Sequence, residues 1–141
     1  MKLEVMSRKK FEEYTKLNHR MTSLVISISS FNEEPPRITN NTGNNILSVL
    51  SIHFNDTADP SPNAYGISRA QAITIANFVK TGIDLADKII VHCGAGQSRS
   101  AGVAAAILKY YTGSDSDIYD NPKYTPNNLC YRKVLEALMD M

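Results

Sequence analysis

Residues 92–100 read His-Cys-Gly-Ala-Gly-Gln-Ser-Arg-Ser and place a thiol, two glycines and an arginine within nine positions. The preceding run, residues 88–91, favours a buried strand, and the alanine-rich run 101–111 favours a buried helix. Backbone N–H groups at the start of a helix converge on one point, and the helix dipole there favours negative charge. The order strand, glycine-containing loop, helix therefore predicts a loop that binds a phosphate group.

Two side chains of this loop are suited to phosphoryl chemistry. The N–H groups that bind an anion also stabilise a thiolate, so Cys93 is a candidate nucleophile. Arg99 follows six residues later and offers a planar pair of donors to phosphoryl oxygens. We call residues 93–99 the Cys93 loop, and we expect the rest of the chain to hold and complete it.

The elements that must position the Cys93 loop alternate along the chain. Strand patterns cover residues 3–6, 23–29, 46–54 and 88–92. Helix patterns cover residues 8–17, a segment from the capping box Ser68-Arg69-Ala70-Gln71 to Gly82, residues 101–111, and a last segment with Pro126 at its first helical position. Continuously apolar strands between helices predict an α/β fold with one mostly parallel sheet of about four to five strands, covered by helices on both faces.

A turn-rich segment with two carboxylates, residues 55–63, follows the expected strand at 46–54. We call it the acidic loop. Ligands of parallel sheets bind at the carboxyl ends of the strands, and both the acidic loop and the Cys93 loop leave strands at that end. We therefore expect the two loops to lie close together.

The composition limits the class of protein. A chain of 141 residues is expected to form a single domain, residues 1–141. The net charge of +1 offers no basic face, so no nucleic-acid partner is expected. No apolar run suits a signal peptide or a membrane span, and the two cysteines lie on different elements, which fits a reducing compartment. The expectation is a cytoplasmic protein without a membrane partner.

The motif His92-Cys93-x-x-Gly96-x-x-Arg99-Ser100 resembles the signature loop of the cysteine-dependent protein tyrosine phosphatase superfamily. Three further features resemble the compact dual-specificity phosphatases: Phe54-Asn55-Asp56-Thr57 after a strand, Ser98-Arg99-Ser100 opening a helix of small residues, and Pro126-Asn127 opening a late helix. The chain also resembles the small bacterial members of the tyrosine phosphatase group. The resemblance covers residues 46–139, and residues 1–45 match only loosely.

This resemblance implies hydrolysis of phosphomonoesters through a cysteinyl-phosphate intermediate. Cys93 attacks the phosphorus, and Ser100 either donates its hydroxyl to the sulfur or only caps the helix. The equatorial phosphoryl oxygens are bound by the Arg99 side chain and by the amides of Gly94, Ala95, Gly96, Gln97, Ser98 and Arg99. His92 is expected to fix the loop by hydrogen bonding. No metal and no cofactor is expected.

A general acid must protonate the leaving oxygen, and four carboxylates lie between residue 54 and Cys93. Asp84 and Asp87 precede the strand at 88–92 and are therefore roughly 15 Å from the loop, at the wrong end. Asp56 lies at the carboxyl end of its strand and matches the family pattern. Asp59, followed by Pro60, is the alternative.

The expected partners are a phosphorylated protein or a small phosphomonoester as substrate and inorganic phosphate as product. The first hypothesis is a phosphatase of phosphotyrosine, with or without phosphoserine and phosphothreonine. The second is a phosphatase of a phosphoinositide, a nucleotide or an RNA 5′ end, although the variable loop positions hold no lysine for a highly charged head group. A non-catalytic phosphate-binding module would lack the thiol, the arginine or the acid, and all three are present.

Two further residues of the last helix carry expectations. Asn127 either tethers the Cys93 loop or caps its helix, and Cys130 is expected in the core.

Overall fold

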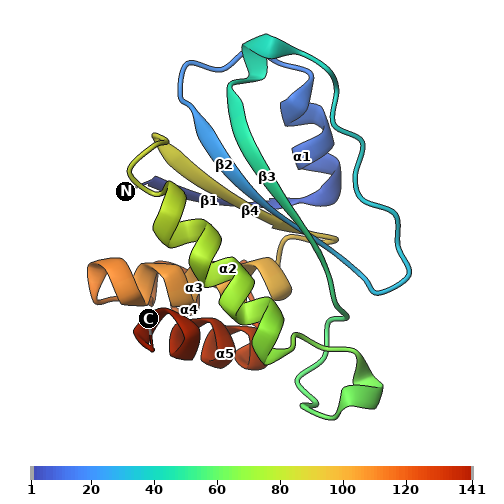
Figure 1. The fold of residues 1–141 in the computed structure, drawn as a ribbon, viewed down its shortest axis with the longest axis vertical. Coiled ribbons are helices and arrows are strands. Elements are labelled where there is room, and N and C mark those ends of the chain that lie inside the picture. The colour runs from blue at the N-terminus through green and yellow to red at the C-terminus, as the bar shows by residue number, and fades with distance from the viewer. Residues whose placement is uncertain (1, 141) are drawn as a thin grey trace.

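The computed structural model describes residues 2–140, in which four parallel strands form one sheet with the order β1-β4-β2-β3 (Figure 1). The strands are β1 (Lys2–Ser7), β2 (Ser23–Ser29), β3 (Ile46–His53) and β4 (Lys88–Cys93). The two central strands, β4 and β2, are buried along their whole length. This confirms the α/β fold with a parallel sheet, because the central strands of such a sheet are covered by helices on both faces.

Helices cover both faces of this sheet, as predicted (Figure 1). The helices are α1 (Arg8–Thr15), α2 (Arg69–Gly82), α3 (Arg99–Thr112), α4 (Ser116–Tyr119) and α5 (Asn128–Met139), with short 3₁₀ turns η1 (Thr42–Asn44) and η2 (Pro62–Ala64). Helix α1 lies on one face and α2 to α5 lie on the other. No helix in residues 2–140 is both long enough and apolar enough to span a membrane.

The core lies mainly between the sheet and the group α2, α3 and α5. Helix α3 is packed so closely that its first nine residues are all buried. A smaller apolar cluster lies under α1 and consists of Met6, Phe11, Tyr14, Val25 and Ile90. Small side chains at the start of α3 let the helix approach the sheet and α5, where a Cβ on Gly102 would lie 2.4 Å from the carbonyl oxygen of Asn127. The Cys93 loop therefore sits between two rigid, buried elements.

Two helix starts follow their sequence signals, and one does not. The Ser7 hydroxyl accepts the N–H of Lys10 at the start of α1, and Ser68 and Gln71 form the expected capping box at α2. The prediction that Pro126 is the first helical residue of the last helix is wrong. Asn127 is the N-cap, because its side chain accepts the N–H of Cys130, and α5 begins one residue later. The sequence also gave no expectation of α4, a single turn within the polar segment 113–125.

Candidate active site

The Cys93 loop connects β4 to α3 and is held from outside by backbone hydrogen bonds. The donors and acceptors are Arg8 N to Gly94 O, Thr125 N to Gln97 O and Asn127 N to Ser98 O, each at 2.9 Å. Three carbonyls of the loop are thus bound to neighbouring segments. The N–H groups of Gly96 and Ser100 are directed at the sulfur of Cys93 instead. The loop therefore has the polarity expected for anion binding, with donors gathered around the thiol.

The thiol of Cys93 is buried and lies 3.0 Å from the hydroxyl oxygen of Ser100. Burial by itself raises the pKa of Cys93. The hydrogen bond with the Ser100 hydroxyl, the N–H groups of Ser100 and Gly96, and the positive charge of Arg99 outweigh burial, and the net result is a pKa below the ordinary value of a thiol. The structure thus places next to the sulfur the same serine that the signature motif singled out.

This arrangement predicts that alkylation of Cys93 by iodoacetamide continues at a lower pH than for an ordinary thiol of pKa about 8.5. The thiolate is the reactive form, so a lowered pKa moves the midpoint of the rate-against-pH curve to lower pH. Ser100→Ala removes one stabilising hydrogen bond and should move the midpoint back upward. Mass spectrometry of the peptide that contains Cys93 measures the rate, and equal midpoints in the two proteins would contradict the role of Ser100.

Gly96 lets the Cys93 loop lie against the end of β1. Its φ is +69°, a left-handed conformation, and a Cβ there would lie 2.6 Å from the carbonyl carbon of Met6 and from the nitrogen of Ser7. Those atoms belong to the backbone of β1, so moving them would disturb the strand. Any residue other than glycine would therefore displace the loop from β1.

Gly96→Ala is accordingly expected to destabilise the protein by at least about 3 kcal/mol, the sum of left-handed strain and overpacking. Gly113 provides a matched control, because its φ is +83° but a Cβ there meets nothing within 4 Å. Gly113→Ala should cost only the strain, about 1 kcal/mol. Urea unfolding measures both changes, and similar losses in the two variants would show that the contact with β1 is unimportant.

Arg99 lies at the base of the loop, buried and fixed by two hydrogen bonds. Its Nη1 donates to the carbonyl of Phe54 at 3.0 Å and to the hydroxyl of Ser30 at 3.1 Å. Its Nε is buried and has no partner in the part of the chain that the structure describes. A buried donor without a partner is costly, and a phosphoryl oxygen above the loop would satisfy it. The hydrogen bonds of Nη1 thus orient the guanidinium, and the edge that carries Nε is available to bind an anion.

Asp56 is bound to the Cys93 loop, although its side chain is exposed. Its Oδ1 accepts hydrogen bonds from the hydroxyl of Ser98 at 2.8 Å and from Nδ2 of Asn127 at 2.9 Å. The Asn127 side chain also caps α5, whereas its contact with the Cys93 loop is made by its backbone N–H, which donates to the carbonyl of Ser98. The two donors hold one oxygen of the carboxyl group, Oδ1, between the Cys93 loop and the start of α5.

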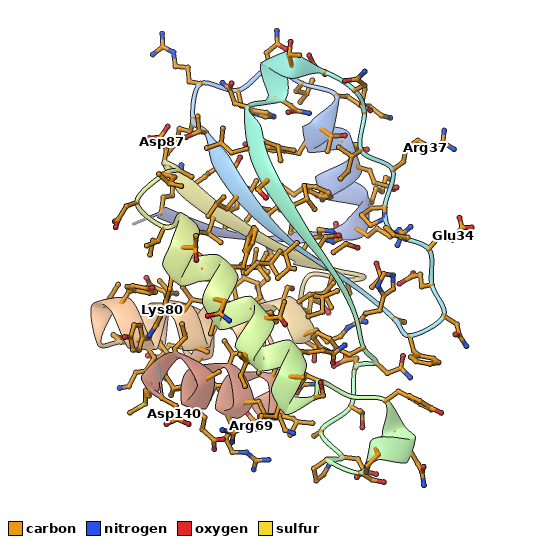
Figure 2. All side chains as sticks on the ribbon, viewed as in Figure 1. Glu34, Arg37, Arg69, Lys80, Asp87 and Asp140 are labelled. Carbon is orange, nitrogen blue, oxygen red and sulfur yellow. The ribbon has the colours of Figure 1, made fainter. Side chains whose placement is uncertain are left out.

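The other three carboxylates have no recorded hydrogen bond to the Cys93 loop in residues 2–140. The Oδ1 of Asp59 accepts the N–H of Ser61 within the acidic loop itself. Asp87 lies at the amino end of β4, where it accepts the N–H of Thr22 (Figure 2). Asp84 lies in the turn before that end of the strand. Asp56 is the carboxylate of this group that the structure brings to the Cys93 loop.

His92 lies behind the loop in the core, fully buried. Its Nε2 is 2.7 Å from the hydroxyl of Ser27, and its ring stacks on Phe11 at 4.5 Å between ring centroids. Burial lowers the pKa of His92 to about 4, so the ring is neutral near pH 7. A neutral, hydrogen-bonded ring fits the expected role of fixing the loop.

The site also contains residues that sequence reasoning missed. Ser30 holds Arg99, and it is the first residue after β2, so the rule that ligands bind at carboxyl ends of strands was a usable signal. Ser27 has no such signal, because it is one of several serines on a continuously buried strand. Of the loop residues expected to bind phosphate, Gly94, Ala95 and Gln97 are exposed on its rim.

Comparison with known proteins agrees with this geometry. No family model matches the chain, and neither does any curated protein sequence. Solved structures do match along nearly the whole chain. Human DUSP28 is 17% identical with a TM-score of 0.67, over 98% of this chain and 92% of its own. Tk-PTP in its active form is 18% identical with a TM-score of 0.61, and the match covers 99% of this chain and 91% of Tk-PTP.

The chain has the fold of the dual-specificity phosphatases. PTPMT1, solved in complex with PI(5)P, shares this fold at 14% identity and a TM-score of 0.59, over 99% of this chain and 91% of its own. The match with human DUSP28 covers 98% of this chain, so it extends into residues 2–45, which include β1 and α1 and match the family pattern only loosely in sequence.

Proposed function

We propose that this protein is a phosphomonoester hydrolase that acts through a cysteinyl-phosphate on Cys93. The observation that carries the proposal is the position of the buried thiol, with its lowered pKa, among loop N–H groups directly beside Arg99. A non-catalytic phosphate-binding module would have no use for an activated thiol. The acidic loop also brings a carboxyl group, that of Asp56, to Ser98 of the Cys93 loop, and such a module would not need it.

In the first step, the thiolate of Cys93 attacks phosphorus opposite the leaving oxygen, so that the S–P bond forms as the P–O bond breaks. Arg99 and the loop amides stabilise the charge on the equatorial oxygens. Asp56 delivers its proton from Oδ2 to the leaving oxygen, which departs as a neutral alcohol or phenol.

In the second step, water attacks the same phosphorus and Asp56 takes its proton. The sulfur leaves as a thiolate, and the hydroxyl of Ser100 eases its departure by donating a hydrogen bond to it. Inorganic phosphate is released, and the enzyme returns to its starting state. In this scheme the protons and electron pairs of both steps are accounted for by Cys93, Asp56, the substrate and water.

Phosphorylated protein is the substrate class that we propose, on tyrosine with or without serine and threonine. PTPMT1 was solved with PI(5)P, so a phosphoinositide is the second candidate. The variable positions of the Cys93 loop are Gly94, Ala95, Gln97 and Ser98, and none of them adds a positive charge. A head group with several phosphates would therefore be poorly neutralised at this site.

A panel of substrates tests the proposal. Release of inorganic phosphate should be measured on phosphotyrosyl and phosphothreonyl peptides, inositol phosphates and nucleotides. After a rapid quench, the peptide that contains Cys93 should carry one phosphoryl group. Turnover without this adduct would overturn the mechanism, and turnover restricted to inositol phosphates would overturn the substrate class.

A further inference from the structure

The two edge strands of the sheet differ in character. In the order β1-β4-β2-β3, the outer strands β1 and β3 each have one neighbour. An exposed edge is a template for pairing with another chain, and proteins commonly protect it with charged side chains or proline. β1 carries Lys2 and Glu4, and Glu4 pairs with Lys10 and Lys88. In contrast, β3 lies almost entirely within residues 38–52, which contain no lysine, arginine, aspartate, glutamate or proline.

The free edge of β3 presents the backbone groups of Val49 and Ser51. The N–H of Phe54 donates to the carbonyl of Ser29 at 2.9 Å, which continues the pairing of β3 with β2. Successive residues of a strand direct their backbone groups to opposite sides, so the even-numbered residues of β3 face β2 and the odd-numbered ones face away. The carbonyl of His53 accepts a hydrogen bond from a side chain of α2. Within residues 2–140, the N–H and C=O groups of Val49 and Ser51 have no partner.

The segment that leads from β2 to η1 does not pair with this edge. It is fixed to α1 instead, where the N–H of Thr39 donates to the hydroxyl of Thr15 at 3.1 Å (Figure 1). An open hollow of about 610 Å³ separates residues 38–44 from the first half of β3, and none of the residues that line it is charged. Ile38 and Leu47 expose apolar surface there. The edge of β3 is therefore accessible to another chain.

We propose that the edge of β3 pairs with the same edge of a second copy of this chain, antiparallel, across a two-fold axis at Leu50. In this register Val49 lies opposite the partner's Ser51, and the two residues exchange both hydrogen bonds. The two-fold axis repeats the exchange, so every free N–H and C=O group of Val49 and Ser51 gains a partner. Leu50 meets the partner's Leu50 at the axis as a non-hydrogen-bonded pair, the kind in which side chains lie closest.

The absence of charge favours a second copy over a foreign strand. A two-fold axis brings each residue near it against the same residue of the other copy, so a charge there would meet a like charge and repel it. A foreign strand imposes no such condition, and opposite charges would make its binding more specific. The pairing is also closed, because β3 has one free edge and the association ends at two copies.

The pairing leaves the Cys93 loops apart. The two β3 strands run in opposite directions in this dimer, so their carboxyl ends, and with them the two Cys93 loops, lie at opposite ends of the joined sheet. Turnover per chain should therefore not depend on the pairing. The inference does not rest on the proposed function, and each can fail without the other.

Sedimentation velocity of the intact protein tests the pairing. At about 100 µM the wild type should have the mass of a dimer. Ser51→Pro removes the outward N–H without touching the ladder to β2, a position where proline is tolerated, and should give a monomer. Ser51→Lys changes an exposed side chain, places like charges on both sides of the axis and should also give a monomer. Ser51→Thr, and Thr81→Lys on the exposed surface of α2, are the matched controls that should remain dimers.

Amide hydrogen exchange locates the interface. The N–H groups of Val49 and Ser51 should exchange about tenfold more slowly at a concentration near 100 times the dimer Kd than in dilute solution, because they exchange from the monomer. The N–H of Leu50 faces β2 and should respond much less. A wild type that stays monomeric at about 100 µM, or a dimer that persists in Ser51→Lys, would overturn the inference. Circular dichroism checks the fold of each variant, and Ser51→Lys decides the outcome if Ser51→Pro does not fold.

Discussion

Cys93→Ser is expected to lower the turnover of aryl phosphates by at least about 10⁴-fold. The Cys93 thiol has a lowered pKa and provides a thiolate near neutral pH, whereas a serine hydroxyl in its place remains protonated and is a poor nucleophile. Arg99 and the loop N–H groups are unchanged in this variant. Vanadate or phosphate should therefore still bind, which a fluorescence or calorimetric titration would measure.

The second cysteine provides the control for this experiment. Cys130 is fully buried on α5, and burial raises its pKa well above that of an ordinary thiol. Cys130→Ala should destabilise the fold modestly and leave turnover within about twofold at temperatures where the protein is folded. Full activity in Cys93→Ser, or loss of activity only in Cys130→Ala, would show that the nucleophile has been assigned to the wrong residue.

Asp56→Asn is expected to lower kcat by about 10²-fold or more on phosphotyrosine, whose leaving group needs a proton. The amide keeps the size of the side chain and still accepts from Ser98 and Asn127, so the loop should remain in place. With p-nitrophenyl phosphate the loss should be smaller, because p-nitrophenolate departs more easily without protonation. The dependence on the leaving group separates a lost proton donor from a misplaced loop.

Asp59→Asn is the matched comparison in the same acidic loop. Asp59 accepts the N–H of Ser61 and has no contact with the Cys93 loop among those that the structure records, so kcat should change by no more than a few fold. Steady-state kinetics of the two variants on both substrates decide the assignment. A large loss in Asp59→Asn with little change in Asp56→Asn would reverse it.

The difference between these two acids shows where sequence reasoning ended. Both lie in one turn-rich segment three residues apart, and both were compatible with a general acid. The choice depends on Ser98 and Asn127, which are 42 and 71 residues away from Asp56 in sequence. No local pattern reports which of two neighbouring carboxylates meets partners so distant.

Helix starts give a parallel case on a smaller scale. The capping box at Ser68 was predicted correctly, because its two hydrogen bonds join residues three positions apart. The start of α5 was placed two residues too early, at Pro126 instead of Asn128, since proline suits a first helical position equally well. Asn127 is the cap in the structure, and its side-chain amide is at the same time fixed by Asp56 and by the carbonyl of Thr57. The residue that caps α5 is therefore also held by a tertiary contact, which a local sequence pattern does not show.

Sequence patterns were enough to predict the Cys93 loop, its flanking strand and helix, and the parallel α/β sheet that carries them. These features depend on neighbouring residues, because apolar periodicity, capping and a glycine-containing turn act over a few positions. The surroundings of the loop come from tertiary contacts, in which Arg99 donates to the hydroxyl of Ser30 and Ser98 donates to Asp56. These contacts join residues 69 and 42 positions apart, and they form because parallel strands bring separate chain segments to one edge of the sheet.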